Sequence, residues 1–321
     1  ADKNIGTGKT VQVSGVTKSG GDAGNYTITQ PTTTANITAK TLMVSGITAN
    51  NKVFSGTVTA TLNTGSAAFV GVESGDSVNI GVGSVNGVFD DANVGTGKTV
   101  TISGVSKSGT DHGNYVISQP FATANITQAT AGLAWSTPVA ITFGTSLSSA
   151  QLNASASVSG SAVYDHAEGE RLNAGTHTLN VTFTPNSNNY ATESASVSLV
   201  VNPKALTITA NDVAITYGGN VTASFTPTGL SSPDAASSVT YRYAGTGSTT
   251  YSSSGTAPST AGTYSVTPSA VVLSSGSNAN YAVTYVAGSL TIARANQQML
   301  VAAAGTTSLT YASPTRETTS L

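Results

Sequence analysis

Short segments of the chain alternate an apolar residue with threonine or serine. Residues 99–105 read TVTISGV, residues 178–183 read TLNVTF and residues 194–201 read SASVSLVV. A period of two residues is typical of a strand with one buried face. Turn-forming Gly, Asn, Asp and Ser separate these segments about every 8 to 12 residues. Because no helical periodicity competes, the pattern predicts an all-β protein in which each domain packs two antiparallel sheets.

The sequence also repeats itself. Residues 2–38 and 91–127 align without a gap at an offset of 89, and 26 of the 37 pairs are identical. Three looser markers continue downstream: an Asn-Tyr pair, a Gly-Thr pair and an aromatic residue that closes a short apolar segment. The Asn-Tyr pairs lie 89, 75 and 91 residues apart, close to the ~100 residues of an immunoglobulin-type sandwich. The markers are Asn25-Tyr26, Asn114-Tyr115, Asn189-Tyr190 and Asn280-Tyr281; Gly95-Thr96, Gly175-Thr176 and Gly262-Thr263; and Phe54, Phe143, Tyr217 and Tyr311.

We therefore predict tandem immunoglobulin-like β-sandwich modules, joined by short linkers into an extended, semi-rigid rod. Residues 1–38 correspond to the C-terminal half of a module, and residues 294–321 to the start of another. A half sandwich exposes a sheet edge and half a core. Either a longer chain or another copy then supplies the missing strands, and strand donation between copies would build a polymer. The three modules between these ends span residues 39–127, 128–202 and 203–293.

Composition narrows the setting and the partners. Charged residues make up 8% of the chain, the formal net charge is −2, and there is no Cys, so disulfides and thiolate metal sites are excluded. The 12 basic residues are dispersed, which does not suit nucleic acid. No run approaches the ~18 apolar residues of a membrane helix. We expect an extracellular or cell-surface protein that contacts its own neighbouring modules, with self-association into fibres or sheets as an alternative.

Residues 92–99, ANVGTGKT, nearly spell a phosphate-binding P-loop. That motif requires a strand, a loop and then a helix, because backbone amides at the helix start cradle the phosphates. Lys98 and Thr99 instead lead into the alternating segment VTISGV, and the sister copy carries Lys3 where the motif needs its first Gly. We expect a strand here and no nucleotide site.

Acidic residues are few. Asp90, Asp91 and the loop 111–114 offer oxygen ligands that suit calcium, although capping of turns by Asp and Asn explains them as well. Glu168 and Glu170 stand two residues apart at a predicted hairpin tip, which lacks the cleft that glycosidase chemistry needs. The sequence therefore leaves two alternatives: a structural calcium ion bound by these oxygen atoms, or no bound metal.

The three histidines, His112, His166 and His177, fall in different modules or turns. None is paired with the Ser and Asp that a catalytic triad needs, so we expect solvent-exposed loop histidines. We predict no catalytic, cofactor-binding or metal-binding residues, no cofactor and no enzymatic activity.

Lysine and asparagine side chains form isopeptide bonds in some immunoglobulin-like modules, which draws attention to Lys40 and Lys98 with Asn36 and Asn125. Such a bond needs an adjacent acid, and no acid sits in these strands. Glycosylation sequons are expected by chance in so Thr-rich a chain. They begin at Asn25, Asn36, Asn125, Asn153, Asn180 and Asn220.

Large aromatic side chains are predicted to form the cores. Trp135 opens the module of residues 128–202, and each later Asn-Tyr pair places its Tyr where the hydroxyl can hydrogen-bond back across a corner of the sandwich. These tyrosines are Tyr115, Tyr190 and Tyr281.

Three segments resemble known repeat families. Residues 39–127, with AKTLMVSGITANNKVFSG, VGTGKTVTISG and GNYVISQP, resemble a YDG-type repeat, whose Tyr-Asp-Gly triplet is here Phe54-Ser55-Gly56. Residues 128–202 are similar to a bacterial Ig-like repeat, and residues 203–293, with ITYGG and AGTYSVTPSA, resemble MBG modules. The resemblance implies a structural or spacer segment of a large exported bacterial surface protein: an adhesin stalk, extracellular fibre or surface-layer component. A ligand- or glycan-binding adhesin region is the alternative.

Overall fold

The computed structural model describes residues 2–300, 310–312 and 318–320, with side chains for residues 2–297. The chain is nearly all β-structure, with 49% of residues in strands, which confirms the predicted fold class. Two compact units are present. Unit 1 comprises residues 1–133, 156–161 and 183–193, and unit 2 comprises residues 134–155, 162–182 and 194–321. The finer module boundaries stay predictions.

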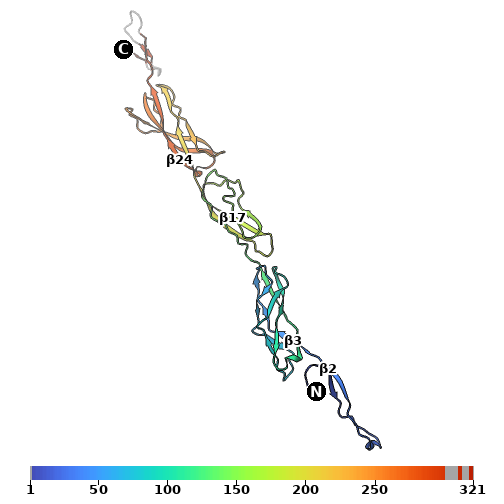
Figure 1. Cartoon of the computed structure of the whole chain (residues 1–321). Helices are drawn as coiled ribbons and strands as arrows, with labels where there is room; N and C mark the ends of the chain where they lie inside the picture. The colour runs from blue at the N-terminus through green and yellow to red at the C-terminus, as the bar shows by residue number, and fades with distance from the viewer. Residues whose placement is uncertain (1, 301–309, 313–317, 321) are drawn as a thin grey trace, which may run out of the picture. The chain divides into compact units, whose positions relative to one another are not determined.

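Unit 1 begins with a two-stranded antiparallel ribbon of β1 (Gly6–Gln12) and β2 (Thr32–Ile37), the latter marked in Figure 1. The loop between the strands carries the 3-10 turn η1 (Ala23–Asn25). Apolar side chains of this segment, such as Val11 and Ile37, are exposed. Among the residues that the structure describes, none packs closely enough on this apolar face to bury it.

Residues 39–127 of unit 1 form four small sheets, of which the largest has five strands in the order β5-β14-β11-β10-β6. A three-stranded sheet has the order β13-β3-β8, and β12-β9 and β4-β7 are strand pairs. The elements are β3 (Lys40–Ser45), β4 (Thr48–Ala49), β5 (Lys52–Val53), β6 (Thr59–Ala60), β7 (Leu62–Asn63), β8 (Ala68–Val70), β9 (Asn79–Gly81), β10 (Asn86–Phe89), β11 (Gly95–Ser103), β12 (Ser106–Ser108), η2 (His112–Asn114), β13 (Tyr115–Ile117) and β14 (Phe121–Thr127).

The core of this region lies between its sheets. Val100 and Ile102 of β11 and Ile126 of β14 are fully or almost fully buried, and Val44 of β3 and Phe69 of β8 pack against their cluster from the other sheet. The inward positions alternate with exposed Thr and Ser, as the period of two residues predicts. Burial of one face of each sheet thus holds the sandwich together.

Residues 134–202 contribute to a sheet of order β15-β18-β17-β16. Leu179 of β17 and Leu199 of β18 are fully buried, and Trp135 packs against the same cluster, as predicted for a core aromatic. Trp135 Nε1 donates to the carbonyl oxygen of Gln151 at 3.0 Å. The strands are β15 (Ile141–Thr142), β16 (Gly160–Tyr164), β17 (Gly175–Pro185; Figure 1) and β18 (Glu193–Asn202).

Residues 203–293 of unit 2 form a sandwich of a three-stranded sheet, β21-β19-β24, and a four-stranded sheet, β20-β25-β23-β22. Leu206 and Ile208 of β19 share a buried cluster with Val271 of β23, so the two sheets pack face to face. The elements are β19 (Lys204–Ala210), β20 (Val213–Thr216), β21 (Phe225–Thr228), β22 (Ala235–Gly245), β23 (Gly262–Ser275), η3 (Asn278–Asn280), β24 (Tyr281–Val286; Figure 1) and β25 (Gly288–Ala293).

The prediction of purely antiparallel sheets is wrong in one respect. The first and last strands of a module pair in parallel: β3 with β13, β5 with β14, β15 with β18, β19 with β24 and β20 with β25. Parallel first and last strands start at the same end of a sandwich. The chain therefore enters each sandwich at one end and leaves it at the other.

After residue 297 the described strands are β26 (Gln298–Leu300), β27 (Thr310–Ala312) and β28 (Thr318–Ser320), which form an antiparallel sheet. Tyr311, the last aromatic marker, lies in β27. The rest of the predicted further module falls outside the described residues. Among the residues that the structure describes, no helix has the length and apolar character needed to cross a membrane.

Candidate functional site

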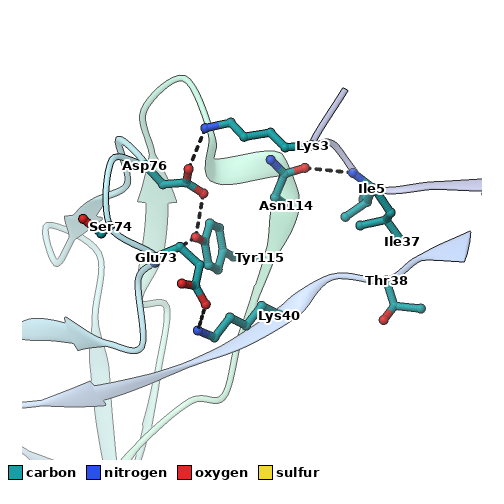
Figure 2. Close-up of a pocket in the computed structure, with 10 residues that line it drawn as sticks. All are labelled: Lys3, Ile5, Ile37, Thr38, Lys40, Glu73, Ser74, Asp76, Asn114 and Tyr115. Atoms are coloured by element: carbon teal, nitrogen blue, oxygen red, sulfur yellow. Dashed lines mark hydrogen bonds and ion pairs between the residues drawn. The ribbon is translucent and has the colours of Figure 1, made fainter. Parts of the chain in front are cut away.

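The polar side chains that recur in the same arrangement lie where one repeat meets the next. At the first such place, Asn114 Oδ1 accepts a hydrogen bond from the Ile5 backbone N–H at 2.9 Å (Figure 2). Its Nδ2 group donates to Asn4 Oδ1 at 3.1 Å. We term this pairing the junction clamp: an Asn two positions before a Gly, the backbone N–H that follows that Asn, and the Asn of the next Asn-Tyr pair.

The junction clamp occurs twice more. In unit 1, the Val94 N–H donates to Asn189 Oδ1 at 2.9 Å, and Asn189 Nδ2 donates to Asn93 Oδ1 at 3.0 Å. An amide side chain satisfies both partners because it offers an acceptor and a donor on one plane. The same chemistry thus joins different pairs of repeats.

In unit 2, the Ala174 N–H donates to Asn280 Oδ1 at 2.8 Å, and Asn280 Nδ2 donates to Asn173 Oδ1 at 3.0 Å. Asn280 is 3% exposed, so this clamp is shielded from water. A buried amide that satisfies its partners holds its neighbours in one defined geometry.

The tyrosine after the clamp Asn braces a corner in two modules. Tyr115 Oη accepts the Glu73 N–H at 3.1 Å and donates to Asp76 Oδ2 at 2.7 Å. Tyr281 Oη accepts the Ser231 N–H at 3.0 Å and donates to Asp234 Oδ2 at 2.6 Å. Both tyrosines thus make the corner bonds that the sequence predicted.

Tyr190 has a different role from the one predicted for it. Its ring packs edge-on against Phe54, with centroids 5.4 Å apart, and its carbonyl oxygen accepts a hydrogen bond from Gln128 Nε2. Among the described residues, its hydroxyl makes no corner bond. The Tyr of the pair is therefore also a packing partner for an aromatic of the preceding repeat.

Phe143 repeats that contact in unit 2. Its ring lies edge-on to Tyr281, with centroids 5.4 Å apart, and edge-on aromatic pairs stabilise beyond their buried area. The backbone N–H of Phe54 donates to the Thr127 carbonyl at 2.8 Å, and that of Phe143 to the Asn202 carbonyl at 2.8 Å. Each aromatic marker is thus fixed by the last strand of its own module while its ring contacts the next.

The first junction also carries ion pairs. Lys3 Nζ lies 2.6 Å from Asp76 Oδ1 (Figure 2). It also lies 2.8 Å from Asp111 Oδ1. The Lys3 ammonium, followed by the Ser77 backbone N–H, lowers the pKa of Asp111 from 3.8 to about 2. Lys3 and then the Tyr115 hydroxyl also lower the pKa of Asp76. These carboxylates are therefore ionised anchors for Lys3 at neutral pH.

A cavity of about 350 Å³ lies beside these ion pairs. Figure 2 shows it open between the Tyr115 ring and the side chains of Ile37 and Thr38, with Lys40 paired to Glu73 at its edge. Its lining is a mixture of apolar side chains and paired charges.

Residues 95–99 of the P-loop-like segment begin strand β11, as predicted. Lys98 Nζ is 3.1 Å from Asp90 Oδ1 and 2.7 Å from Asp91 Oδ2, so the acids considered for calcium pair with a lysine. Hydrogen bonding to Lys98 also lowers the pKa of Asp91. Throughout the described ranges, no cluster of three or more His, Asp and Glu side chains has an arrangement that would hold a metal. These acids therefore anchor a strand.

The histidines lie apart from one another. His112 Nδ1 contacts the Gly109 carbonyl, and His166 Nδ1 lies 3.1 Å from Glu170 Oε1. His177 is in strand β17 and half-buried, so the expectation of an exposed loop is wrong for it. Its Nε2 binds the carbonyl oxygen of Asn173, a clamp residue, at 2.8 Å.

The two asparagines considered for isopeptide bonds accept hydrogen bonds from glycine backbone groups instead. Asn36 Oδ1 accepts the Gly8 N–H, and Asn125 Oδ1 accepts the Gly97 N–H. The sequence analysis expected no acid beside Lys98, but Asp91, in the loop before strand β11, pairs with it. Glu168 lies in the turn before Glu170, whose Oε2 accepts the Ala167 N–H. Asn153 and Asn180 bond locally, to the Ala150 carbonyl and to Asp165.

Sequence reasoning missed the junction clamp itself. Its signal was present as NIGT, NVGT and NAGT, an Asn two positions before each of three Gly-Thr pairs. The partner could not be read locally, because the paired asparagines are 96 to 110 residues apart.

Comparison with known proteins identifies the repeats. A YDG domain model matches residues 1–35 and 38–126, and an MBG domain (YGX type) model matches residues 206–291. No curated protein matches the sequence. The resemblance of residues 128–202 to a bacterial Ig-like repeat stays a prediction.

Several solved structures are similar in part. The N-terminal four Ig domains of Dscam1 isoform 7.44 are 11% identical over 81% of this chain and 73% of that chain, with a TM-score of 0.25. Sidekick-1 immunoglobulin domains 1–5 are 11% identical over 79% and 59%, with a TM-score of 0.23. Drosophila N-cadherin EC1–4 is 7% identical over 92% and 85%, with a TM-score of 0.23. Scores this low carry no further argument, and the family matches decide: the chain is a tandem repeat protein that contains YDG domains and an MBG domain.

Proposed function

We propose that this chain is a structural spacer segment of a large exported bacterial surface protein, such as an adhesin stalk, an extracellular fibre or a surface-layer component. The observation that carries the proposal is the junction clamp, which recurs with the same atoms at three places. A spacer needs modules held in a fixed relation to their neighbours, and repeat proteins derive their stability from such nearest-neighbour contacts.

The distribution of polar side chains supports this proposal over catalysis. The Lys3 cluster, the clamp asparagines and the corner tyrosines all bond to other parts of the chain. A binding or catalytic site instead directs polar groups towards a vacant position where a ligand lies. This distribution favours a structural role over an enzymatic one.

Small-angle X-ray scattering of the intact chain tests the spacer role. We expect rod-like scattering with a narrow cross-section, and a broader distance distribution when Asn189 and Asn280 are both changed to Ala. Asn220→Ala, at an exposed position, is the matched control and should leave the curve unchanged. A compact particle, or a double variant that scatters like the parent, contradicts the proposal.

A glycan array distinguishes the adhesin alternative. The spacer proposal expects no saturable binding by the intact chain. Tight binding that is lost on substitution in a single loop would replace the spacer role with a ligand-binding one.

A further inference from the structure

An apolar patch lies on the outer face of the sheet β13-β3-β8, on the side turned away from the core. Met43 and Val70 are direct partners across β3 and β8, and their side chains are 66% and 52% exposed. Val116 of β13 is 47% exposed and pairs with Thr41, which shares a face with Met43 because the two are two positions apart. The other outward positions of these strands hold Ser and Ala, so the outward side chains of this sheet are uncharged.

Phe121 extends the patch at the point where the chain passes from β13 into β14. Its side chain is 75% exposed. Together with Met43, Val44 and residues 118–120 it borders a hollow of about 160 Å³. A cavity of about 150 Å³ takes up a benzene ring, so this hollow has the size of a phenylalanine ring. An exposed aromatic ring thus lies beside a hollow that fits a ring of the same kind.

The duplication shows that the fold does not require these apolar side chains. At the offset of 89, Phe121 corresponds to Thr32 and Val116 corresponds to Thr27. Thr32 and Phe121 have equivalent partners on the adjoining strands β1 and β11, so either residue suits the strand. Apolar side chains that gather on a surface without serving the core mark a contact with another molecule.

We propose that this patch binds the same patch on a second molecule of this chain, across a two-fold axis. Phe121 of each molecule enters the hollow beside Met43 of the other, because a two-fold contact makes every pairing reciprocal. Met43 is unbranched and adapts its shape to the incoming ring.

Two properties of the patch identify the partner as a second molecule. The ring and the hollow lie on one surface, so an identical surface supplies both halves of the contact. The outward side chains are uncharged, so two such faces meet without repulsion between like charges. The patch is small beside the ~800 Å² per partner of a stable complex, and the dimer is therefore weak and reversible. This contact does not depend on the spacer role.

Sedimentation equilibrium of the intact chain tests the contact. We expect a dimer whose fraction rises with concentration, and an association at least about tenfold weaker in Phe121→Thr, because a central aromatic dominates contacts of this kind. The variant keeps the fold, since Thr32 stands at the same position of β2. Val139→Thr is the matched control at a side chain that is 86% exposed outside the patch, and it should leave association unchanged. A monomer at every concentration, or a dimer that Phe121→Thr leaves intact, overturns the proposal.

A single thiol locates the contact. The chain has no Cys, so Ser118→Cys places one thiol at an exposed position that borders the hollow. A short bis-maleimide should join two such molecules, and adding Phe121→Thr should slow that reaction at least about tenfold. Ser252→Cys, exposed in residues 203–293, is the control and should react at a rate that Phe121→Thr does not change. Equal rates for the two thiols would place the contact elsewhere and refute the proposal.

Discussion

Asn280 forms the most buried of the three junction clamps. Changing it to Ala leaves the Ala174 N–H without its acceptor, and loss of a partner inside a protein costs about 1–3 kcal/mol. We expect the free energy of unfolding to fall by that amount and the Ala174 amide to exchange faster. Denaturant titration and hydrogen exchange measure the two effects. Asn220→Ala is the control, and an unchanged Ala174 amide would contradict the assignment.

Lys3 controls the titration of Asp111. A carboxyl whose pKa is lowered from 3.8 to about 2 stabilises the fold above 3.8, and that contribution is lost as the pH falls through about 2. In Lys3→Ala the pKa of Asp111 should rise, yet stay below 3.8 because the Ser77 N–H still donates to it. Titration of the carboxyl carbon by NMR measures this, with Lys18→Ala as control. A pKa that stays at about 2 would refute the role of Lys3.

The corner hydroxyls offer a comparison between modules. Tyr115→Phe removes a bond to Asp76 and leaves the Glu73 N–H unpaired, so we expect a loss of about 1–3 kcal/mol. Tyr190→Phe should cost little, since Tyr190 contributes its ring and its carbonyl oxygen. Denaturation curves of the two variants measure the loss in free energy of unfolding. Equal losses would contradict the different roles of the Tyr115 and Tyr190 hydroxyls.

The role of a residue could be predicted from the sequence only where its partner lies in the same module. Tyr115 and Tyr281 were predictable because a corner forms within one module. Asn114 was visible only as a marker, since its partner lies 110 residues away and nothing local distinguishes a clamp from a turn. Tyr190 was misassigned for the same reason, because Phe54 comes from the preceding repeat.

At the scale of elements, one turn glycine shows how residues 39–90 restrict the substitutions that residues 91–127 tolerate. Gly104 has φ +84°, and a Cβ there would lie 2.4 Å from the Ser84 carbonyl oxygen. Gly15, its counterpart in the ribbon, has φ +82° and nothing within 4 Å. Both conformations disfavour alanine, but only Gly104→Ala also forces a backbone clash.

We therefore expect Gly104→Ala to lower the free energy of unfolding of residues 39–127 by at least about 1 kcal/mol more than Gly15→Ala does. Denaturation followed by the amides of β11 reports that difference. Equal effects of the two substitutions would show that the Ser84 backbone does not restrict the residue at position 104.

The strands themselves followed from the period of two residues, but their pairing did not. Periodicity identifies which face of β3 is buried, but it does not show which strand pairs with β3. The parallel pairing of β3 with β13 joins residues about 75 positions apart along the chain, as between Lys40 and Tyr115. Pairing of that range depends on the whole sandwich, which is why the antiparallel expectation failed there.

At the scale of the whole molecule, residues 39–127, 134–202 and 203–293 form separate buried clusters, and Phe143 packs against two of these clusters. It contacts the cluster that contains Leu199 and the cluster that contains Leu206. A side chain shared by two cores couples their stabilities, so unfolding of one should weaken the other. Cooperation between modules in unit 2 then depends on this residue.

Phe143→Ala should therefore destabilise both cores together. A fully buried Phe loses about 3–5 kcal/mol on this change, and the half-buried Phe143 should lose about 2 kcal/mol. Fluorescence of Trp135, the only Trp in the chain, reports the first core, and hydrogen exchange of Leu206 reports the second. Val139→Ala, at a side chain that is 86% exposed, is the control. If only one probe shifts, the cores are independent and Phe143 belongs to a single module.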